Sequence, residues 1–228
     1  MWLKDSSIGR KLVMSISGIF LVLFLTFHAL MNITVLFSAD AYNAVAGALG
    51  ANWYALIGTA VLAAGFVVHI LYALYLSFLN MKARGNDKYA VTARQEGVSW
   101  SSKNMLVLGV IVFGFLVLHM IHFWSKMQLV ELIHGHEWEA AGKVDPTNGA
   151  YFINELFSNP IYCLIYIVWL AALWFHLTHG VWSSLQSIGL NNKTWLPRVK
   201  CFSNIYATII ILLFMAIPVF FLFGFRAL

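Results

Sequence analysis

Long apolar runs separated by short polar segments dominate the pattern of this chain. About 20 helical residues cross a hydrocarbon core of about 30 Å, and a backbone that faces lipid must form its hydrogen bonds within its own segment. The pattern therefore predicts an all-α membrane protein, a bundle of five transmembrane helices in a single domain over residues 1–228. The uncharged stretches lie at about 12–38, 52–81, 104–125, 159–188 and 201–225.

The composition supports this prediction. Of the 228 residues, 61% are hydrophobic and only 10% are charged, whereas about 25% of an ordinary soluble domain is charged. A soluble domain of this size could not cover its surface with so few charges. Tryptophans also stand near the predicted helix ends, where aromatic side chains gather at membrane interfaces. They are Trp53, Trp100, Trp124 and Trp195.

The net charge of +5 could indicate nucleic-acid binding, but the positions of the basic residues indicate membrane topology instead. On one side of the predicted bundle the basic residues are only three, and they lie among acidic residues: Lys126, Lys143 and Arg226. Cytoplasmic loops are enriched in lysine and arginine, so we expect a cytoplasmic N-terminus, a C-terminus outside and no nucleic-acid partner. The residues of the basic side are Lys4, Arg10, Lys11, Lys82, Arg84, Lys88, Arg94, Lys103, Lys193, Arg198 and Lys200.

The two cysteines, Cys163 and Cys201, form no CxxC pair, and no CxxCH segment is present. Covalent attachment of a c-type haem is therefore excluded. The first apolar stretch could be a cleaved signal peptide, but it is long and contains a histidine. We expect it to remain as a membrane helix.

Histidines are the chemically informative residues of the predicted helices. Ionisable side chains at membrane depth are costly and usually mark function. One such histidine could simply form a hydrogen bond between helices, but four consecutive predicted spans each carry at least one. The six intramembrane histidines are His28, His69, His119, His122, His176 and His179.

The depth of four histidines follows from the helical rise of about 1.5 Å per residue. His28 follows the cytoplasmic Lys11 by 17 residues, and His119 follows Lys103 by 16, so both lie in the outer half of the bilayer. The second and fourth spans run in the opposite direction.

In those two spans, His69 follows Asn52 by 17 residues and His176 follows Pro160 by 16. Both therefore lie in the inner half. The predicted topology sorts the four histidines into an inner pair, His69/His176, and an outer pair, His28/His119.

Two imidazoles from neighbouring helices at one level suit the bis-histidine ligation of a b-type haem. The pattern therefore predicts two haems, offset by roughly 15 Å along the membrane normal. Gly18 and Gly109 each precede an outer histidine by ten residues, which places them near the inner site. A missing side chain there could admit a macrocycle or allow close helix packing.

His122 and His179 each follow a predicted ligand by three residues, on nearly the same helix face. They are alternative ligands, or they form hydrogen bonds to a propionate, a quinone or another helix. In the loop after the third span, His134, His136 and Glu137 resemble a weak metal site. A solvated loop explains that cluster better.

These features together resemble one known family, the cytochrome b subunits of succinate:quinone and quinol:fumarate reductases, in the class with one five-span anchor and two haems. The resemblance covers nearly the whole chain and depends on the order and spacing of four histidines. The segments that carry it are Ser15-Ile16-Ser17-Gly18 with Phe27-His28, Val68-His69-Ile70-Leu71-Tyr72, Gly109 with Leu118-His119, and Phe175-His176-Leu177-Thr178-His179-Gly180-Val181-Trp182.

The resemblance implies a proximal haem held by His69 and His176, a distal haem held by His28 and His119, and a propionate contact at Ser15. It implies a flavoprotein subunit with dicarboxylate chemistry, an iron–sulfur subunit on the cytoplasmic face, and a quinone, commonly menaquinone, in a bacterial inner (cytoplasmic) membrane. Some family members carry a glutamate, implicated in proton movement, where this chain has Trp174. That proton route is therefore in doubt.

Other classes of membrane protein remain open at this stage. The cytochrome b subunits of hydrogenase, formate dehydrogenase and nitrate reductase also hold haems between helices, although their histidine spacing fits less well. A metal-ion transporter could line a path with histidines, but the predicted spans contain no carboxylate of the kind that such ions generally need. A structural anchor without haem is the fourth reading.

Overall fold

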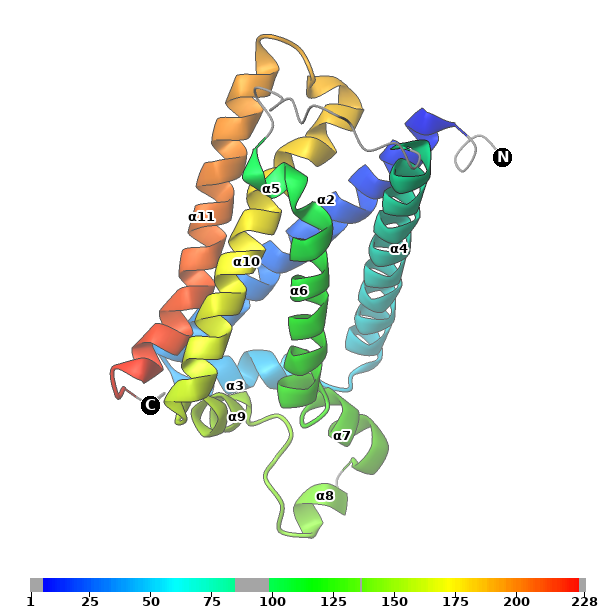
Figure 1. The fold of residues 1–228 in the computed structure, drawn as a ribbon. Helices are drawn as coiled ribbons and strands as arrows, with labels where there is room; N and C mark the ends of the chain where they lie inside the picture. Colours follow the sequence, from blue (N-terminus) through cyan, green and yellow to red (C-terminus); the bar gives the residue numbers. More distant parts are fainter. Residues whose placement is uncertain (1–5, 85–98, 136, 226–228) are drawn as a thin grey trace.

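The computed structural model describes residues 6–84, 99–135 and 137–225, and these residues form helices and no strand. Five helices are long and apolar enough to cross a membrane, as the sequence predicts (Figure 1). Five residues named above lie outside the described residues: Lys4, Lys88, Arg94, His136 and Arg226. The five long helices are α2 (Ser7–Asn32), α4 (Trp53–Arg84), α6 (Met105–His119), α10 (Pro160–Leu185) and α11 (Trp195–Leu222).

Side-chain caps define where several helices begin. The Ser6 hydroxyl accepts a hydrogen bond from the backbone N–H of Gly9 and so caps α2. Asn159 caps α10 through the N–H of Ile161, and Pro160 occupies the first turn, where its missing N–H costs nothing. Ser99 caps the short helix α5 (Trp100–Lys103), which leads into α6.

Two spans begin earlier than their uncharged stretches predict. Helix α2 starts at Ser7 rather than near residue 12, and α11 starts at Trp195 rather than near residue 201. The added turns contain Arg10 and Lys200, whose aliphatic stems can lie along a helix while their charged ends reach water. A search for uncharged residues stops at such side chains, although the helix does not.

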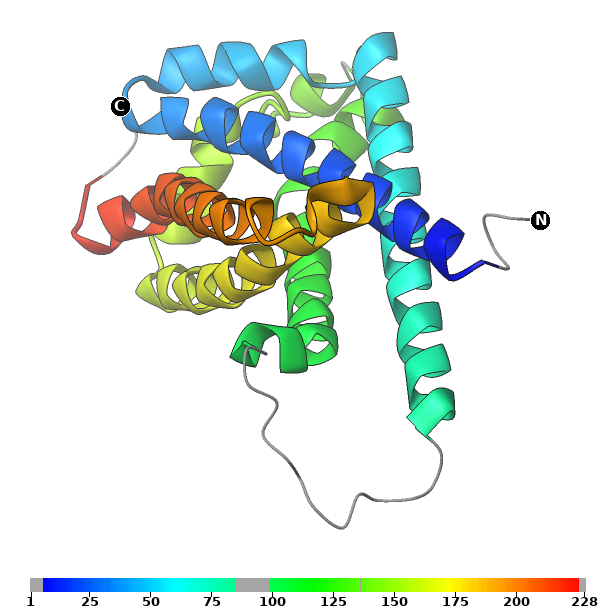
Figure 2. The same ribbon diagram turned by 90° about the horizontal axis from the view of Figure 1, so that it is seen from above.

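In cross-section, four of the spans form a ring. Helix α2 packs closely on α4 and on α10, α10 packs closely on α6, and α4 and α6 touch more lightly. Viewed along the bundle, α2 lies opposite α6 and α4 lies opposite α10 (Figure 2). Neither of these diagonal pairs packs closely. Helix α11 lies outside the ring, mainly against α10, where the sequence predicts a span without histidine.

Basic residues gather at the end of the bundle where α2 begins and α4 ends, called here the basic end. Helix α10 passes at this end into the π-helical turn η3 (Gln186–Leu190). The turn contains Gly189 at φ +100°, a conformation that favours glycine. Arg198 and Lys200 lie over the rings of Trp195 and Trp182, respectively.

Short helices cover the opposite end, called here the loop end. They are α3 (Ala39–Ala48), α7 (Gln128–His134), α8 (Glu137–Ala140) and α9 (Gly149–Phe157) (Figure 1). The connection after the first span, residues 38–51, is short and weakly charged, a pattern that favours a small surface helix, and α3 confirms it. The segment Asp145-Pro146-Thr147-Asn148-Gly149 predicts a turn, and the structure has one there, closed by a hydrogen bond from the Asn148 N–H to the Asp145 carbonyl. The remainder of the acidic segment 126–158 reads as a loop in the sequence, and this prediction is wrong for α7, α8 and α9.

Helix α9 escapes sequence recognition because it is short and amphipathic. Its apolar side is buried, and polar side chains define where it begins: Asp145 accepts from the Thr147 N–H, and Asn148 caps the helix through the Tyr151 N–H. Of the buried residues of α9, Ala150, Ile153 and Phe157 join a core cluster with residues of α10 and α11. Nine residues are too few to resemble a span.

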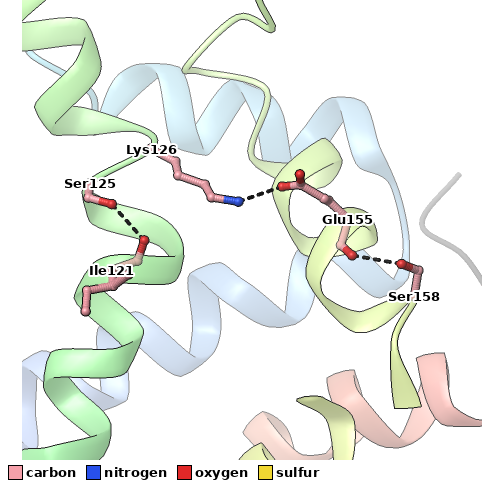
Figure 3. Close-up of polar contacts among 5 residues, drawn as sticks. All are labelled: Ile121, Ser125, Lys126, Glu155 and Ser158. Atoms are coloured by element: carbon pink, nitrogen blue, oxygen red, sulfur yellow. Dashed lines mark hydrogen bonds and ion pairs between the residues drawn. The ribbon is translucent and has the colours of Figure 1, made fainter. Parts of the chain in front are cut away.

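Polar side chains tie the loop end together. The Lys126 ammonium lies 2.8 Å from the Glu155 carboxylate, so it links the end of the third span to α9 (Figure 3). In the same view, Ser125 and Ser158 donate hydrogen bonds to backbone carbonyls on the two sides of this ion pair. Lys126 and Glu155 are nearly half exposed, so the pair positions surface segments rather than supplying much stability.

Candidate bis-histidine site

Two histidines of opposite helices meet toward the loop end. His28 lies on α2 and His119 on α6, and their ring centroids are 5.8 Å apart with the ring planes nearly perpendicular, at 85°. Both side chains are partly buried inside the bundle. This is the outer pair that depth along the sequence predicts.

Two further histidines meet nearer the basic end. His69 of α4 and His176 of α10 have ring centroids 6.5 Å apart and an interplanar angle of 68°. This is the predicted inner pair. The structure thus brings together the four histidines in the same two combinations that the predicted topology gives.

The helices that carry each pair are not neighbours, in contrast to the sequence-based expectation. The outer pair spans the diagonal from α2 to α6, and the inner pair spans the diagonal from α4 to α10. Diagonal helices of a four-membered ring are farther apart than adjacent ones, so only side chains reach across. Each pair therefore lies on the axis of the bundle rather than in a seam between packed helices.

Glycines of the remaining two helices face the inner pair. A Cβ atom added to Gly18 of α2 would lie 3.7 Å from Cε1 of His69, and one added to Gly109 of α6 would lie 3.8 Å from Cε1 of His176. All four helices of the ring thus meet at this level. The predicted depth of both glycines is confirmed.

The same glycines measure the offset between the two pairs. Gly18 and His28 lie ten residues apart on the uninterrupted helix α2, and Gly109 and His119 lie ten residues apart on α6. With a helical rise of about 1.5 Å per residue, each interval corresponds to about 15 Å. The two pairs therefore lie at different levels of the bundle, with the offset that the sequence predicts.

The geometry of both pairs fits ligation of one metal ion by two imidazoles. Imidazoles on opposite sides of an ion, with metal–nitrogen bonds of about 2 Å, have ring centroids roughly 6 Å apart. The measured separations of 5.8 and 6.5 Å bracket this value. The glycines beside the inner pair leave the backbone accessible there, as a large planar group would require. The separation of the histidines therefore fits a haem at each level, and the glycines add room for one at the inner level.

Aromatic rings surround the outer pair. Phe24 stacks on His28 at 5.2 Å, and Phe214 of α11 lies 5.7 Å from the same ring. Trp169 of α10 and Phe123 lie 6.0 and 5.1 Å from His119. Such rings exclude water and lower the local polarity, and this is one of the means by which a protein controls a redox group.

Hydrogen bonds hold one histidine of each pair. Nδ1 of His69 lies 3.3 Å from the hydroxyl of Ser17. Nδ1 of His28 lies 3.3 Å from the Asn32 amide, which also donates to the His28 carbonyl and accepts from the Tyr42 hydroxyl. By contrast, Nδ1 of His119 and Nδ1 of His176 are buried without a hydrogen-bond partner.

The two additional histidines take different positions. Immediately after His119 the third span widens into the π-helical turn η2 (Met120–Trp124), in which the Ser125 N–H donates to the Met120 carbonyl. The extra residue rotates His122 away from the face of His119. Nδ1 of His122 then lies 2.9 Å from the Tyr166 hydroxyl of α10, so His122 forms the interhelical contact that was one of its expected roles.

His179 packs edge-on against Trp182 of its own helix, with centroids 4.8 Å apart, and its Nδ1 is buried without a partner. Ser15, the residue that the resemblance links to a propionate, is buried on α2 and donates its hydroxyl proton to the Ser184 carbonyl of α10. Its hydroxyl can still accept a hydrogen bond, but its single proton is already engaged.

Trp174 occupies the position where some members of the family that the sequence resembles carry a glutamate. Its indole N–H donates to the Thr208 hydroxyl of α11 at 3.0 Å. The indole is therefore satisfied by a neighbouring helix and offers no titratable group at this depth.

Four of the described histidines meet in two pairs. Within the described ranges, no group of three or more histidine, cysteine, aspartate or glutamate side chains is arranged to hold a metal ion. A haem needs only two protein ligands, because the macrocycle supplies the other four. His134 of the weak loop cluster instead stacks on Trp138, with ring centroids 5.1 Å apart.

Sequence reasoning missed several residues around the site. Asn32 follows His28 by one helical turn, a spacing that could have linked it to the outer pair. Tyr42 contacts Asn32 from α3 and Trp169 contacts His119 from α10, and nothing in their spacing along the chain predicts these contacts. The π-helical turn after His119 also has no recognisable sequence pattern. Another local signal is the Ser17-Gly18 dipeptide: Ser17 contacts His69, and a Cβ added to Gly18 would lie beside the same ring.

Comparisons with models of protein families, with curated proteins and with solved structures find no match to this chain. The fold and the site therefore define its class: a multi-pass helical membrane protein with two histidine pairs on its axis.

Proposed function

We propose that the chain is a di-haem cytochrome b, the membrane anchor of a succinate:quinone or quinol:fumarate reductase. His69 and His176 would hold one haem, and His28 and His119 the other. Two haems at these levels would carry single electrons between an iron–sulfur subunit at the basic end and a quinone, commonly menaquinone in this class. The dicarboxylate chemistry would belong to a partner flavoprotein.

The observation that carries the proposal is the paired geometry of the four histidines. Each pair has the separation that two imidazoles on one iron require, and each joins helices that do not pack closely on one another. Histidines that served only helix packing would lie in the seams between adjacent helices. The resemblance in histidine order and spacing supports the choice of this family.

The orientation of the chain also belongs to the proposal. Arg10, Lys82, Lys103 and Lys200 lie toward one end of the bundle, and cytoplasmic surfaces of membrane proteins are enriched in such residues. The basic end would then face the cytoplasm of a bacterium and receive the iron–sulfur subunit. The inner pair is nearer to that end and would be the first to exchange electrons with it.

A reduced-minus-oxidised absorbance spectrum of the purified full chain tests the proposal. We expect a b-type α band and about two haems per chain when the haem is extracted and quantified. A colourless preparation that binds divalent ions would contradict it and favour the transporter reading. Co-purification of a subunit with covalent flavin would distinguish this family from hydrogenase and formate dehydrogenase cytochromes.

A further inference from the structure

Among the residues that the structure describes, Ser17 forms a side-chain hydrogen bond with the inner pair, through His69. It lies on α2, is only 7% exposed, and is followed by Gly18, whose missing side chain lets α2 approach the same imidazole. Neither residue shares a helix with His69 or His176, so the contact joins two elements of the ring.

The hydrogen bonds of Ser17 can be assigned from its single proton. Its Oγ donates to the Met14 carbonyl, one turn earlier in α2, at 3.1 Å. A hydroxyl has one proton and two lone pairs. With that proton on the Met14 carbonyl, Oγ accepts in the 3.3 Å contact with Nδ1 of His69, and the imidazole is the donor. The proton of neutral His69 is therefore on Nδ1.

This assignment has a chemical consequence. A neutral imidazole with its proton on Nδ1 has a lone pair on Nε2, the form that ligates a metal ion, and an acceptor at Nδ1 fixes the orientation of the ring and strengthens the bond to the metal. His176 lacks such a partner, because its Nδ1 is buried without a hydrogen bond.

We propose that Ser17 is a positioning residue for His69: the acceptor that it presents to Nδ1 holds the imidazole in the tautomer and orientation that ligate the inner haem iron. This inference rests on the proposed bis-histidine function. Ser17 does not touch the iron and acts only through His69.

The test is a redox titration of the full-length haem-loaded chain, combined with the low-temperature electron paramagnetic resonance spectrum of the ferric state. Loss of the acceptor makes the imidazole a weaker ligand for ferric iron, so the midpoint potential of the inner haem should rise in Ser17→Ala. The expected change in the ferric-to-ferrous equilibrium is about tenfold, which is about 59 mV for a one-electron couple. The outer haem should be unchanged.

A matched pair of variants separates the hydroxyl from the volume of the side chain. Ser17→Thr keeps an oxygen that can donate to the preceding turn, so it should retain the wild-type potential. Valine has nearly the same shape as threonine but no hydroxyl, so Ser17→Val should reproduce the shift in midpoint potential of Ser17→Ala. Ser203→Ala removes another buried hydroxyl, one that bonds backbone carbonyls of α10, and should change neither haem.

The outcomes are distinguishable from failure of the proposed function. A wild-type chain with two haems whose inner potential and resonance spectrum are identical in Ser17→Ala would overturn the role of Ser17 and leave the function standing. Equal shifts in Ser17→Thr and Ser17→Val would also overturn it, because volume would then be the cause. A wild-type chain without haem would overturn the function itself, and the inference with it.

Discussion

His28 and His119 face each other at 5.8 Å between ring centroids, although the helices that carry them do not pack closely. The same is true of His69 and His176 on the other diagonal of the ring. Imidazoles that reach across a bundle in this way are costly to leave unpartnered at membrane depth. A metal ion bound between them, as proposed above, would give both members of a pair a partner at once.

The first prediction concerns these pairs. His28→Ala and His119→Ala should each remove the same spectral component, and His69→Ala and His176→Ala should each remove the other, because both ligands of one haem must be present to hold it. The measurement is the haem content and the redox titration of the four variants. Loss of one common component in His28→Ala and His69→Ala would show that the pairing is wrong.

The second prediction concerns the glycines beside the inner pair. Gly18→Leu and Gly109→Leu should reduce the content of the inner haem and spare the outer one, because a Cβ at either position already lies in contact with an imidazole. Gly114→Leu is the matched control on α6, since its Cβ would meet nothing within 4 Å, and it should retain both haems. Equal haem loss in all three variants would contradict a local effect.

The third prediction concerns His122. His122→Ala and Tyr166→Phe should both retain two haems, because the π-helical turn directs His122 to the Tyr166 hydroxyl rather than toward His28. Removing a hydrogen bond between membrane helices should cost about 0.6 kcal/mol of stability. Haem quantification checks that both variants retain two haems. Loss of the outer haem in His122→Ala would make His122 the ligand in place of His119.

The fourth prediction concerns Gln128 at the loop end. Its amide oxygen accepts from Thr59 and Trp124, and its amide nitrogen donates to the carbonyls of Leu49 and Gly50. Gln128→Leu removes all of these bonds, so we expect a loss of roughly 2–4 kcal/mol of stability, at about 1 kcal/mol for each bond. Thermal unfolding in detergent measures it.

Gln186→Leu is the control for this prediction, because Gln186 makes one long contact of 3.4 Å to Asn191 at the basic end. It should unfold at nearly the wild-type temperature. An equally small change in the unfolding temperature of Gln128→Leu would mean that the stability of the loop end does not depend on the Gln128 side chain.

The fifth prediction concerns pH. Burial raises the pKa of Tyr42, in helix α3, to about 12, against about 10 in an unfolded chain. The folded state thus resists ionisation of this phenol, and the associated stability, at most roughly 2–3 kcal/mol, is present below pH 10 and is lost as the pH rises toward 12.

Comparison of wild type with Tyr42→Phe isolates this contribution from the other tyrosines. The stability difference between the two proteins, measured by unfolding in detergent, should narrow between pH 10 and 12 as the wild type weakens. A difference that stays constant over this interval would contradict the raised pKa.

The number, order and approximate bounds of the spans were determined by the sequence alone, because a bilayer imposes a length and a polarity that appear directly in the residue pattern. The pairing of His28 with His119 and of His69 with His176 was predicted from the same pattern, because helices are rigid rods with a constant rise. Counting residues from the membrane edge is then equivalent to measuring depth.

Only the tertiary structure decided which helices face each other. It placed the histidine pairs on the diagonals of a ring, rotated His122 toward Tyr166 through a π-helical turn, and brought Ser17 to Nδ1 of His69. Depth along the normal does not fix the angular order of helices around the bundle axis. That order comes from side-chain packing between segments that are distant in sequence, and no local pattern contains it.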